Sequence, residues 1–206
     1  MVRAIIVVAA YIAAQMMADI TSLKIITLGG LSMDAGTFVY PLTFTLRDLV
    51  HKTLGITAAR TLIITAAVIN LIMAGLFWFV AKLPGDPQVG PQLEFAAVLA
   101  PVWRIVIASI IAEVVAELID TEAYRIWVER HGQNHQWARV LVSNGFSVPI
   151  DSIIFSFIAF YGAMPLGVVF GIILSNILVK GVTTLVSLPL IYTVPERRIE
   201  LTLEEP

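Results

Sequence analysis

Charged side chains interrupt stretches of apolar sequence that are long enough to cross a lipid bilayer. Asp151 and Lys180 each lie inside such a stretch, and a third stretch, residues 102–127, carries several more ionisable groups. A charged side chain at the centre of a bilayer costs roughly 2.5–3.5 kcal/mol on insertion scales, so it is retained where it pairs, meets water or binds a ligand. These residues therefore predict a polar site inside a membrane-embedded helix bundle.

Polar side chains in four of these stretches recur at helical spacing, which places each set along one face of a helix. The four sets are Gln15 and Asp19; Glu113, Glu117 and Asp120; Asn144 and Asp151; and Asn176 and Lys180. Because consecutive spans run in opposite directions, four residues are expected near mid-depth: Gln15, Glu113, Asp151 and Asn176. We expect these faces to converge on one cavity. Carboxylates and amides there would suit a ligand with several N–H donors or a positive charge.

A purely structural interpretation of the same residues stays open. Either of two carboxylates, Asp151 or Glu117, could form an ion pair with a nearby cation and lock two helices together. The available cations are Lys180 and Arg104. The buried amides could likewise be hydrogen-bonding groups between helices. Carboxylates outnumber cations at this depth, which favours a ligand site for the set as a whole.

Three carboxylates are interpreted separately from the residues expected near mid-depth. Asp48 and Asp120 are interpreted as gating or structural polar residues. For Asp48, near the cytoplasmic boundary, a solvated or headgroup-binding role is an equal alternative. Asp19 is expected close to the outer surface.

The composition is that of a membrane protein. Hydrophobic residues make up 58% of the 206 residues, charged residues make up 14%, and the mean hydropathy is +0.89. These values are far from the balance of a soluble domain. The net charge of -2 and the scattered basic residues argue against a nucleic-acid partner. The chain has no cysteine, which excludes disulfides, thiolate metal sites and a cysteine nucleophile.

Six apolar segments are long enough to cross a hydrocarbon layer of about 30 Å, which needs about 20 helical residues. We predict an all-α, polytopic integral membrane protein whose single domain covers residues 1–206. Its six transmembrane helices are expected at 2–23, 35–54, 57–82, 100–127, 138–160 and 165–192. The first segment is too long for a signal-peptide core and is taken as a span. Lysine and arginine concentrate in the loops on one side, which predicts that both termini are cytoplasmic.

Two of the predicted spans contain features that could shape a binding site. In the fifth span, Asn144 and Pro149 precede Asp151, which predicts a broken or bent helix beside a carboxylate. In the second span, Tyr40 and Phe44 present rings that could stack on a planar ligand. Ordinary packing is the commoner role of a single aromatic side chain, so both interpretations of these rings remain open.

The sequence carries no enzyme signature. The three histidines lie in or beside loops, and the HExxH, GxSxG, P-loop and dinucleotide-binding patterns are absent. Glu113 and Glu117 are four residues apart, but without a histidine in the spans they make a poor pair of metal ligands. We therefore expect neither an enzyme nor a bound cofactor or metal.

A set of short motifs occurs in order over most of the chain. They are residues 35–41 (AGTFVYP), Phe44, Arg47-Asp48, Leu54-Gly55, Ala59-Arg60, Arg104, residues 116–120 (AELID), Ile150-Asp151-Ser152, Phe155 and Lys180. In this order they resemble the six-helix VUT or YhhQ-type family, described as queuosine precursor transporters. One departure is His51-Lys52, where many members have a glutamate shortly after the aspartate of the second span.

The resemblance implies uptake of 7-deazaguanine bases, in their cyano and aminomethyl forms, across the bacterial cytoplasmic membrane. The residues that match its polar pattern are Asp48, Arg104, Glu117, Asp120, Asp151 and Lys180. Glu117 and Asp151 would accept the N–H groups of the ligand, and Asn144 or Asn176 would bind its remaining edge. Asp151→Asn is then expected to abolish uptake while leaving the protein inserted and folded.

An alternative function is the substrate-binding membrane subunit of a multi-subunit vitamin importer, powered by a partner ATPase. The first span has alanines spaced so that another helix can approach closely. That spacing suits such a subunit, a homodimer or packing within the chain. For a solitary transporter, both proton coupling and facilitated diffusion are compatible with the sequence. Uptake by the purified protein alone in liposomes would separate the two functions.

Overall fold

The structure is a computed structural model that describes residues 2–40, 42–43, 46, 50, 54–131 and 136–187. Over these residues the chain is mostly helical. The elements in chain order are α1 (Val2–Thr21), β1 (Ile25–Leu28), β2 (Leu31–Asp34), the 3-10 helix η1 (Ala35–Phe38), α3 (Ile56–Val80), α4 (Leu93–Leu99), α5 (Val102–His131), α6 (Gln136–Phe160) and α7 (Leu166–Ser187).

Five helical stretches in the described part of the chain are long and apolar enough to cross a membrane. They are Ala4–Thr21, Thr57–Val80, Leu93–Ala116, Leu141–Phe160 and Leu166–Val186. These stretches correspond to five of the six predicted spans. Of the second predicted span, residues 35–54, the structure describes 35–40, 42, 43, 46, 50 and 54, and Ala35–Phe38 there form a 3-10 helix. The cytoplasmic position of the termini stays a prediction.

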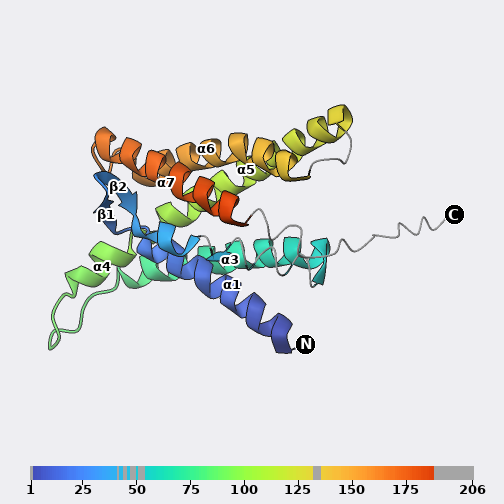
Figure 1. Cartoon of the computed structure of the whole chain (residues 1–206). Helices are drawn as coiled ribbons and strands as arrows, with labels where there is room; N and C mark the ends of the chain where they lie inside the picture. The colour runs from blue at the N-terminus through green and yellow to red at the C-terminus, as the bar shows by residue number, and fades with distance from the viewer. Residues whose placement is uncertain are drawn as a thin grey trace.

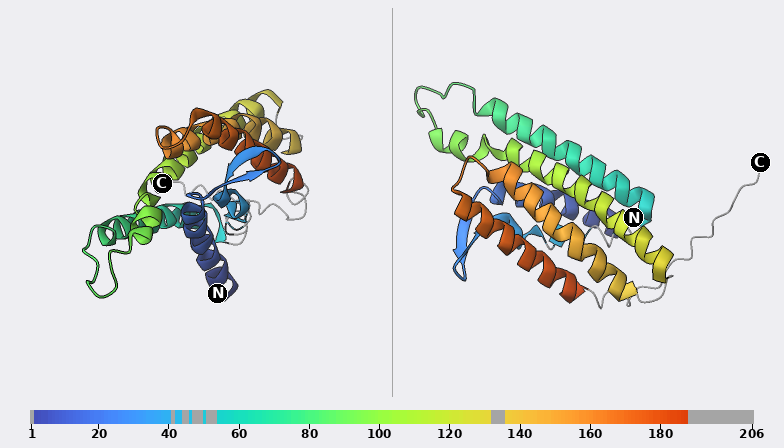
Figure 2. Two further views of the ribbon diagram at one scale, coloured as in Figure 1. Left: turned by 90° about the vertical axis from the view of Figure 1, so that its left-hand side faces the viewer. Right: turned by 90° about the horizontal axis from the view of Figure 1, so that it is seen from above.

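The helices form two layers that meet along α5 (Figure 1). On one side of α5 lie α6 and α7, and on the other side lie α1 and α3. The views in Figure 2 show the same grouping, with α3, α5, α6 and α7 inclined in a similar direction. The β1–β2 hairpin and η1 lie at the end of the bundle where α1 ends and α7 begins.

A β-hairpin lies between the first and second predicted spans. Leu28 lies opposite Leu31, so only Gly29 and Gly30 form the turn. Their φ angles are 58° and 82°, a backbone conformation that glycine adopts without steric cost and that two-residue hairpin turns require. The hairpin returns the chain to the end of α1, with Asp34 as its last residue.

Helix α6 continues without interruption through Pro149. The prediction of a broken fifth span is therefore wrong, and of the two expected forms only a bent helix is compatible with the structure. A proline inside a helix removes one backbone hydrogen bond, because it has no N–H group. The missing hydrogen bond is the one that residue 149 would donate, half a turn before Asp151 on the same helix.

Apolar side chains cover the outside of the bundle as well as its core. On the outer faces, Ile64, Ile72, Leu118 and Val186 are each at least 65% exposed. Soluble monomers rarely expose apolar patches of this extent, whereas in a bilayer such side chains contact lipid. The core cluster next to the hairpin joins α5, α6 and α7 and contains Ile105, Ala108, Ala159, Phe160, Val169, Ile172 and Ile173.

Candidate functional site

A small polar cavity lies where α1, η1, α5, α6 and α7 meet. It is lined by Ala18, Asp19, Ser22, Asp34, Thr37, Tyr40, Ser109, Ala112, Asp151, Phe155, Asn176 and Lys180. The volume that the centre of a water molecule can occupy is about 20 Å³. One water needs roughly 10–15 Å³ on this measure, so the cavity has room for about one water molecule and must widen to admit a larger ligand.

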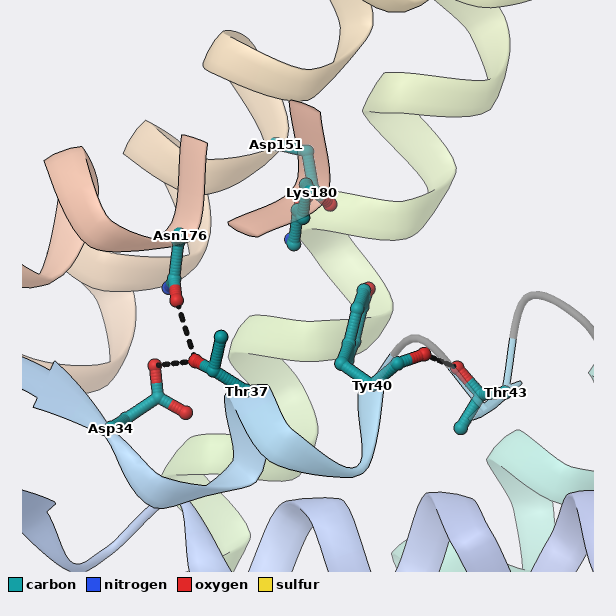
Figure 3. Close-up of polar contacts among 7 residues, drawn as sticks. All are labelled: Asp34, Thr37, Tyr40, Thr43, Asp151, Asn176 and Lys180. Atoms are coloured by element: carbon teal, nitrogen blue, oxygen red, sulfur yellow. Dashed lines mark hydrogen bonds and ion pairs between the residues drawn. The ribbon is translucent and has the colours of Figure 1, made fainter. Parts of the chain in front are cut away.

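An ion pair between α6 and α7 forms one wall of the cavity. Lys180 Nζ contacts Asp151 Oδ2, and the same ammonium group lies 4.3 Å from the centroid of the Tyr40 ring (Figure 3). Lys180 and Asp151 are both 8% exposed, so the pair is largely shielded from solvent. The alternative that Asp151 pairs with Lys180 is thus confirmed, and the two charges balance each other on this wall.

A hydrogen-bonded network around Asp34 joins the hairpin to α1 and α7. Ser22 Oγ donates to Asp34 Oδ1 at 2.9 Å. Thr37 Oγ1 lies 3.2 Å from Asp34 Oδ2 and 2.7 Å from the side-chain oxygen of Asn176 (Figure 3). A hydroxyl has one proton and can donate it to only one of these acceptors. If Thr37 donates to the carboxylate, a 180° turn of the Asn176 amide lets its NH₂ donate to Thr37.

Asp19 forms a second acidic position in the cavity. Its side chain is 4% exposed, and Ser109 Oγ on α5 donates to Asp19 Oδ1 at 3.1 Å. Among the described residues, no lysine or arginine forms an ion pair with Asp19 or Asp34. Buried carboxylates are usually paired with a cation or held by several hydrogen bonds. The wall formed by these two residues is therefore rich in acceptors and offers them to any bound ligand.

The structure brings four of the predicted site residues to the cavity: Tyr40, Asp151, Asn176 and Lys180. Four others are described but do not line it. Gln15 donates to the Tyr11 hydroxyl at 3.0 Å, Glu113 and Asn144 are half-buried on α5 and α6, and Arg104 lies near the end of α6. The remaining predictions are Glu117 and Asp120, whose side chains are not described, and Phe44 and Asp48, which lie outside the described residues.

Arg104 binds the C-terminal end of α6 instead of the cavity. Its Nε donates to the carbonyl oxygen of Ile158 at 2.7 Å, and its Nη2 donates to the carbonyl oxygen of Tyr161. The last carbonyls of a helix lack partners within the helix, and a positive charge there also interacts favourably with the helix dipole. Arg104 thus ties α5 to α6 and has a structural position.

Arg104→Met is expected to lower the midpoint of thermal unfolding in detergent. Hydrogen bonds to a charged group each contribute about 1.5–3 kcal/mol, and the substitution removes two of them while keeping an unbranched apolar stem. Arg60→Met is the matched control, because Arg60 is exposed on α3. Equal unfolding midpoints for the two variants would contradict the structural role.

Several cavity residues were missed by the sequence analysis. Ser22, Asp34, Thr37 and Ser109 were not considered, and Asp19, on a face expected to converge on the cavity, was not assigned as a binding residue. A signal for Asp34 was present, since the Gly-Gly pair between two apolar runs is typical of a two-residue hairpin turn. Such a turn would have placed Asp34 opposite Ile25, close to the end of the first predicted span.

The two matches to known proteins are both to transporters. A family model described as "Putative vitamin uptake transporter" matches residues 34–194. "Probable queuosine precursor transporter" of Bacillus subtilis (strain 168) is 25% identical over 181 residues, which cover 85% of this chain and 77% of the relative. No solved structure matches the chain at a significant level. The family match begins at Asp34, so α1 and β1 precede it.

Proposed function

The chain belongs to the vitamin uptake transporter family, and from this premise we propose that it imports a queuosine precursor or a related small heterocycle across the cytoplasmic membrane. The proposed ligands are 7-cyano-7-deazaguanine and 7-aminomethyl-7-deazaguanine. Support comes from the relative named as a queuosine precursor transporter and from the five apolar helical stretches of the described chain. The proposed binding site is the cavity between α1, η1, α5, α6 and α7.

The observation that carries the proposal is the acceptor-rich wall of the cavity. A deazaguanine presents ring and exocyclic N–H groups along one edge, and a carboxylate accepts such groups with up to four lone pairs. Asp19 and Asp34 offer carboxylate oxygens without a cationic partner among the described residues. Asn176 can donate to the carbonyl group of the base, and the Tyr40 ring is part of the same lining. The aminomethyl form would add a positive charge that suits the same wall.

Uptake by the purified protein in liposomes is the direct test of this proposal. We expect radiolabelled 7-cyano-7-deazaguanine or its aminomethyl form to accumulate in vesicles that contain this chain alone, and the same compound to raise its unfolding temperature in detergent. Binding without transport would favour the alternative of a substrate-binding subunit that needs a partner ATPase. If the chain neither binds nor transports either base, the proposal is refuted.

Asp19→Asn is expected to weaken binding of the transported base by about tenfold to a hundredfold. The substitution keeps the size of the side chain but replaces one carboxyl oxygen by an NH₂ group, and a buried polar group left without a partner costs about 1–3 kcal/mol. The affinity is measured from the ligand concentration dependence of the unfolding temperature. Asp86→Asn, the same change in an exposed loop, is the control and should bind like the unmodified chain. Equal affinities for both variants would remove Asp19 from the site.

A further inference from the structure

The segment from Ile25 to Phe38, which comprises β1, β2 and η1, lies at one end of the bundle and contributes to the lining of the cavity. We call it the hairpin cap. It supplies Asp34 and Thr37 to the lining of the cavity, which has room for about one water molecule. A bicyclic base is several times larger than water, so part of this lining must move before such a ligand can enter. The contacts of the hairpin cap indicate which part moves.

The hairpin cap is attached firmly to α1. Only residues 22–24 separate α1 from β1, and Ala35 N donates to the carbonyl oxygen of Lys24 at 2.9 Å. Ser22 Oγ donates to Asp34 Oδ1 at 2.9 Å, which is a charge-assisted bond when the carboxylate is ionised. Gly36 approaches the end of α1 so closely that a methyl group in its place would lie 2.6 Å from the carbonyl oxygen of Ala18. These contacts favour movement of the hairpin cap together with α1.

Strand β2 packs along α7, and the polar contacts between the hairpin cap and α7 involve only neutral groups. Ser175 Oγ lies 3.0 Å from the carbonyl oxygens of both Ser32 and Ile172, and it can donate its single proton to only one of them. Thr37 Oγ1 lies 2.7 Å from the side-chain oxygen of Asn176. Both are hydrogen bonds between neutral groups, which are about half as strong as charge-assisted ones. Gly171 adds a close approach without a polar contact, because β2 packs against its backbone at Ser32. The hairpin cap and α7 are far apart in the sequence, so no short loop links them as residues 22–24 link α1 to β1.

We propose that the hairpin cap is the gate of the transport site and opens by separating from α7 while it stays attached to α1. This proposal rests on the proposed function and adds the moving element. Separation breaks the Ser32–Ser175 and Thr37–Asn176 contacts and widens the cavity between η1 and α7. The Lys180–Asp151 pair holds α6 and α7 together during this movement. Thr37 and Asn176 then become free to bind the entering ligand in place of each other.

Crosslinking the hairpin cap to α7 tests the gate, and the absence of native cysteines makes the chain suitable for it. A Cβ at position 171 would lie 3.1 Å from Cβ of Ser32, somewhat closer than the roughly 3.5–4.5 Å of a relaxed disulfide. Neither position lines the cavity. In the Ser32→Cys/Gly171→Cys variant, oxidation is expected to reduce liposome uptake of the base at least tenfold, and reduction with dithiothreitol is expected to restore it.

The matched control places a disulfide inside the hairpin cap. Thr27 lies directly opposite Ser32 across the two strands, so Thr27→Cys/Ser32→Cys can form a bridge that does not reach α7. Oxidation of this variant should leave uptake unchanged within twofold. Equal uptake by the oxidised and reduced forms of the Ser32→Cys/Gly171→Cys variant would overturn the gate, provided that mass spectrometry shows the bridge.

A second measurement decides the matter if the double variant is inactive even when reduced. Ser175 is 5% exposed beneath β2, so a thiol at this position is covered while the cap is closed. We expect Ser175→Cys to react with a maleimide at a rate that changes at least threefold when 7-cyano-7-deazaguanine or its aminomethyl form is added. If Ser175→Cys fails to react both in the absence and in the presence of these bases, the gate is overturned. Absence of uptake by the unmodified chain would instead refute the proposed function, whatever the crosslinks do.

Discussion

Gly36→Ala is expected to abolish uptake and to lower the unfolding temperature. The added Cβ would lie 2.0 Å from Ser22 Oγ, 2.6 Å from the carbonyl oxygen of Ala18 and 3.1 Å from Asp34 Oδ1. The Ser22 hydroxyl can rotate away only by leaving Asp34, and the carbonyl oxygen of Ala18 belongs to the backbone of α1. The hairpin cap must therefore move off α1, which disrupts the acceptor-rich wall.

The size of this effect can be bounded from known core substitutions. An extra methyl group in a well-packed site typically costs 1–3 kcal/mol, and contact with backbone on one side places Gly36 toward the upper end of that range. Gly75→Ala on α3 is the control, because its Cβ would meet nothing within 4 Å. It should be neutral or stabilising, since alanine favours a helix over glycine by roughly 1 kcal/mol. Thermal unfolding and liposome uptake of both variants measure the difference; similar values would contradict the close approach.

Removing one partner of the Lys180–Asp151 pair is expected to destabilise the protein strongly and to abolish uptake. Asp151→Asn leaves a buried ammonium without its counter-charge, and Lys180→Gln leaves a buried carboxylate in the same position. Breaking a buried pair in this way costs about 3–5 kcal/mol in soluble proteins. This revises the expectation from the sequence that Asp151→Asn would leave the folded protein intact. The unfolding temperature in detergent of each single variant is the measurement.

The double variant Asp151→Asn/Lys180→Gln separates the two roles of this pair. Neutral amides of similar size can hydrogen-bond to each other, so we expect the unfolding temperature to recover most of the loss of the single variants. If the pair also contacts the transported base, uptake stays at least tenfold below that of the unmodified chain. Recovery of uptake together with stability would show that the pair only locks α6 to α7.

Hydropathy and length were sufficient to locate most of the membrane-spanning helices. Helices α3 and α6 begin and end within a few residues of the predicted spans, and α7 begins within a few residues of its span, because each apolar run is bounded by glycine, proline or charged residues. The predicted start of the fourth span missed α4, which precedes Pro101 and continues the apolar stretch into α5. A span prediction that counts apolar residues cannot detect a helix that is interrupted at one residue and then continues.

The partners of the polar residues could not be predicted from the sequence. Lys180 and Arg104 are both cations in apolar helices, yet one binds a carboxylate in the cavity and the other binds the carbonyl end of α6. Which of these occurs depends on how α5 and α7 are rotated and at what depth they cross. Helical spacing gives the face of a residue within its own helix but not the facing residue of the next one. The cavity lining from η1 was missed for the same reason.

The family match begins at Asp34, whereas Asp19 and Ser22 belong to the segment before it. A substrate assignment that compares only the matched region would thus omit part of the proposed binding wall. Two members could share every residue from Asp34 onward and still select different cargo through their first helix. Swapping α1 between paralogues would then be a compact route to altered nutrient preference, for evolution and for engineering alike.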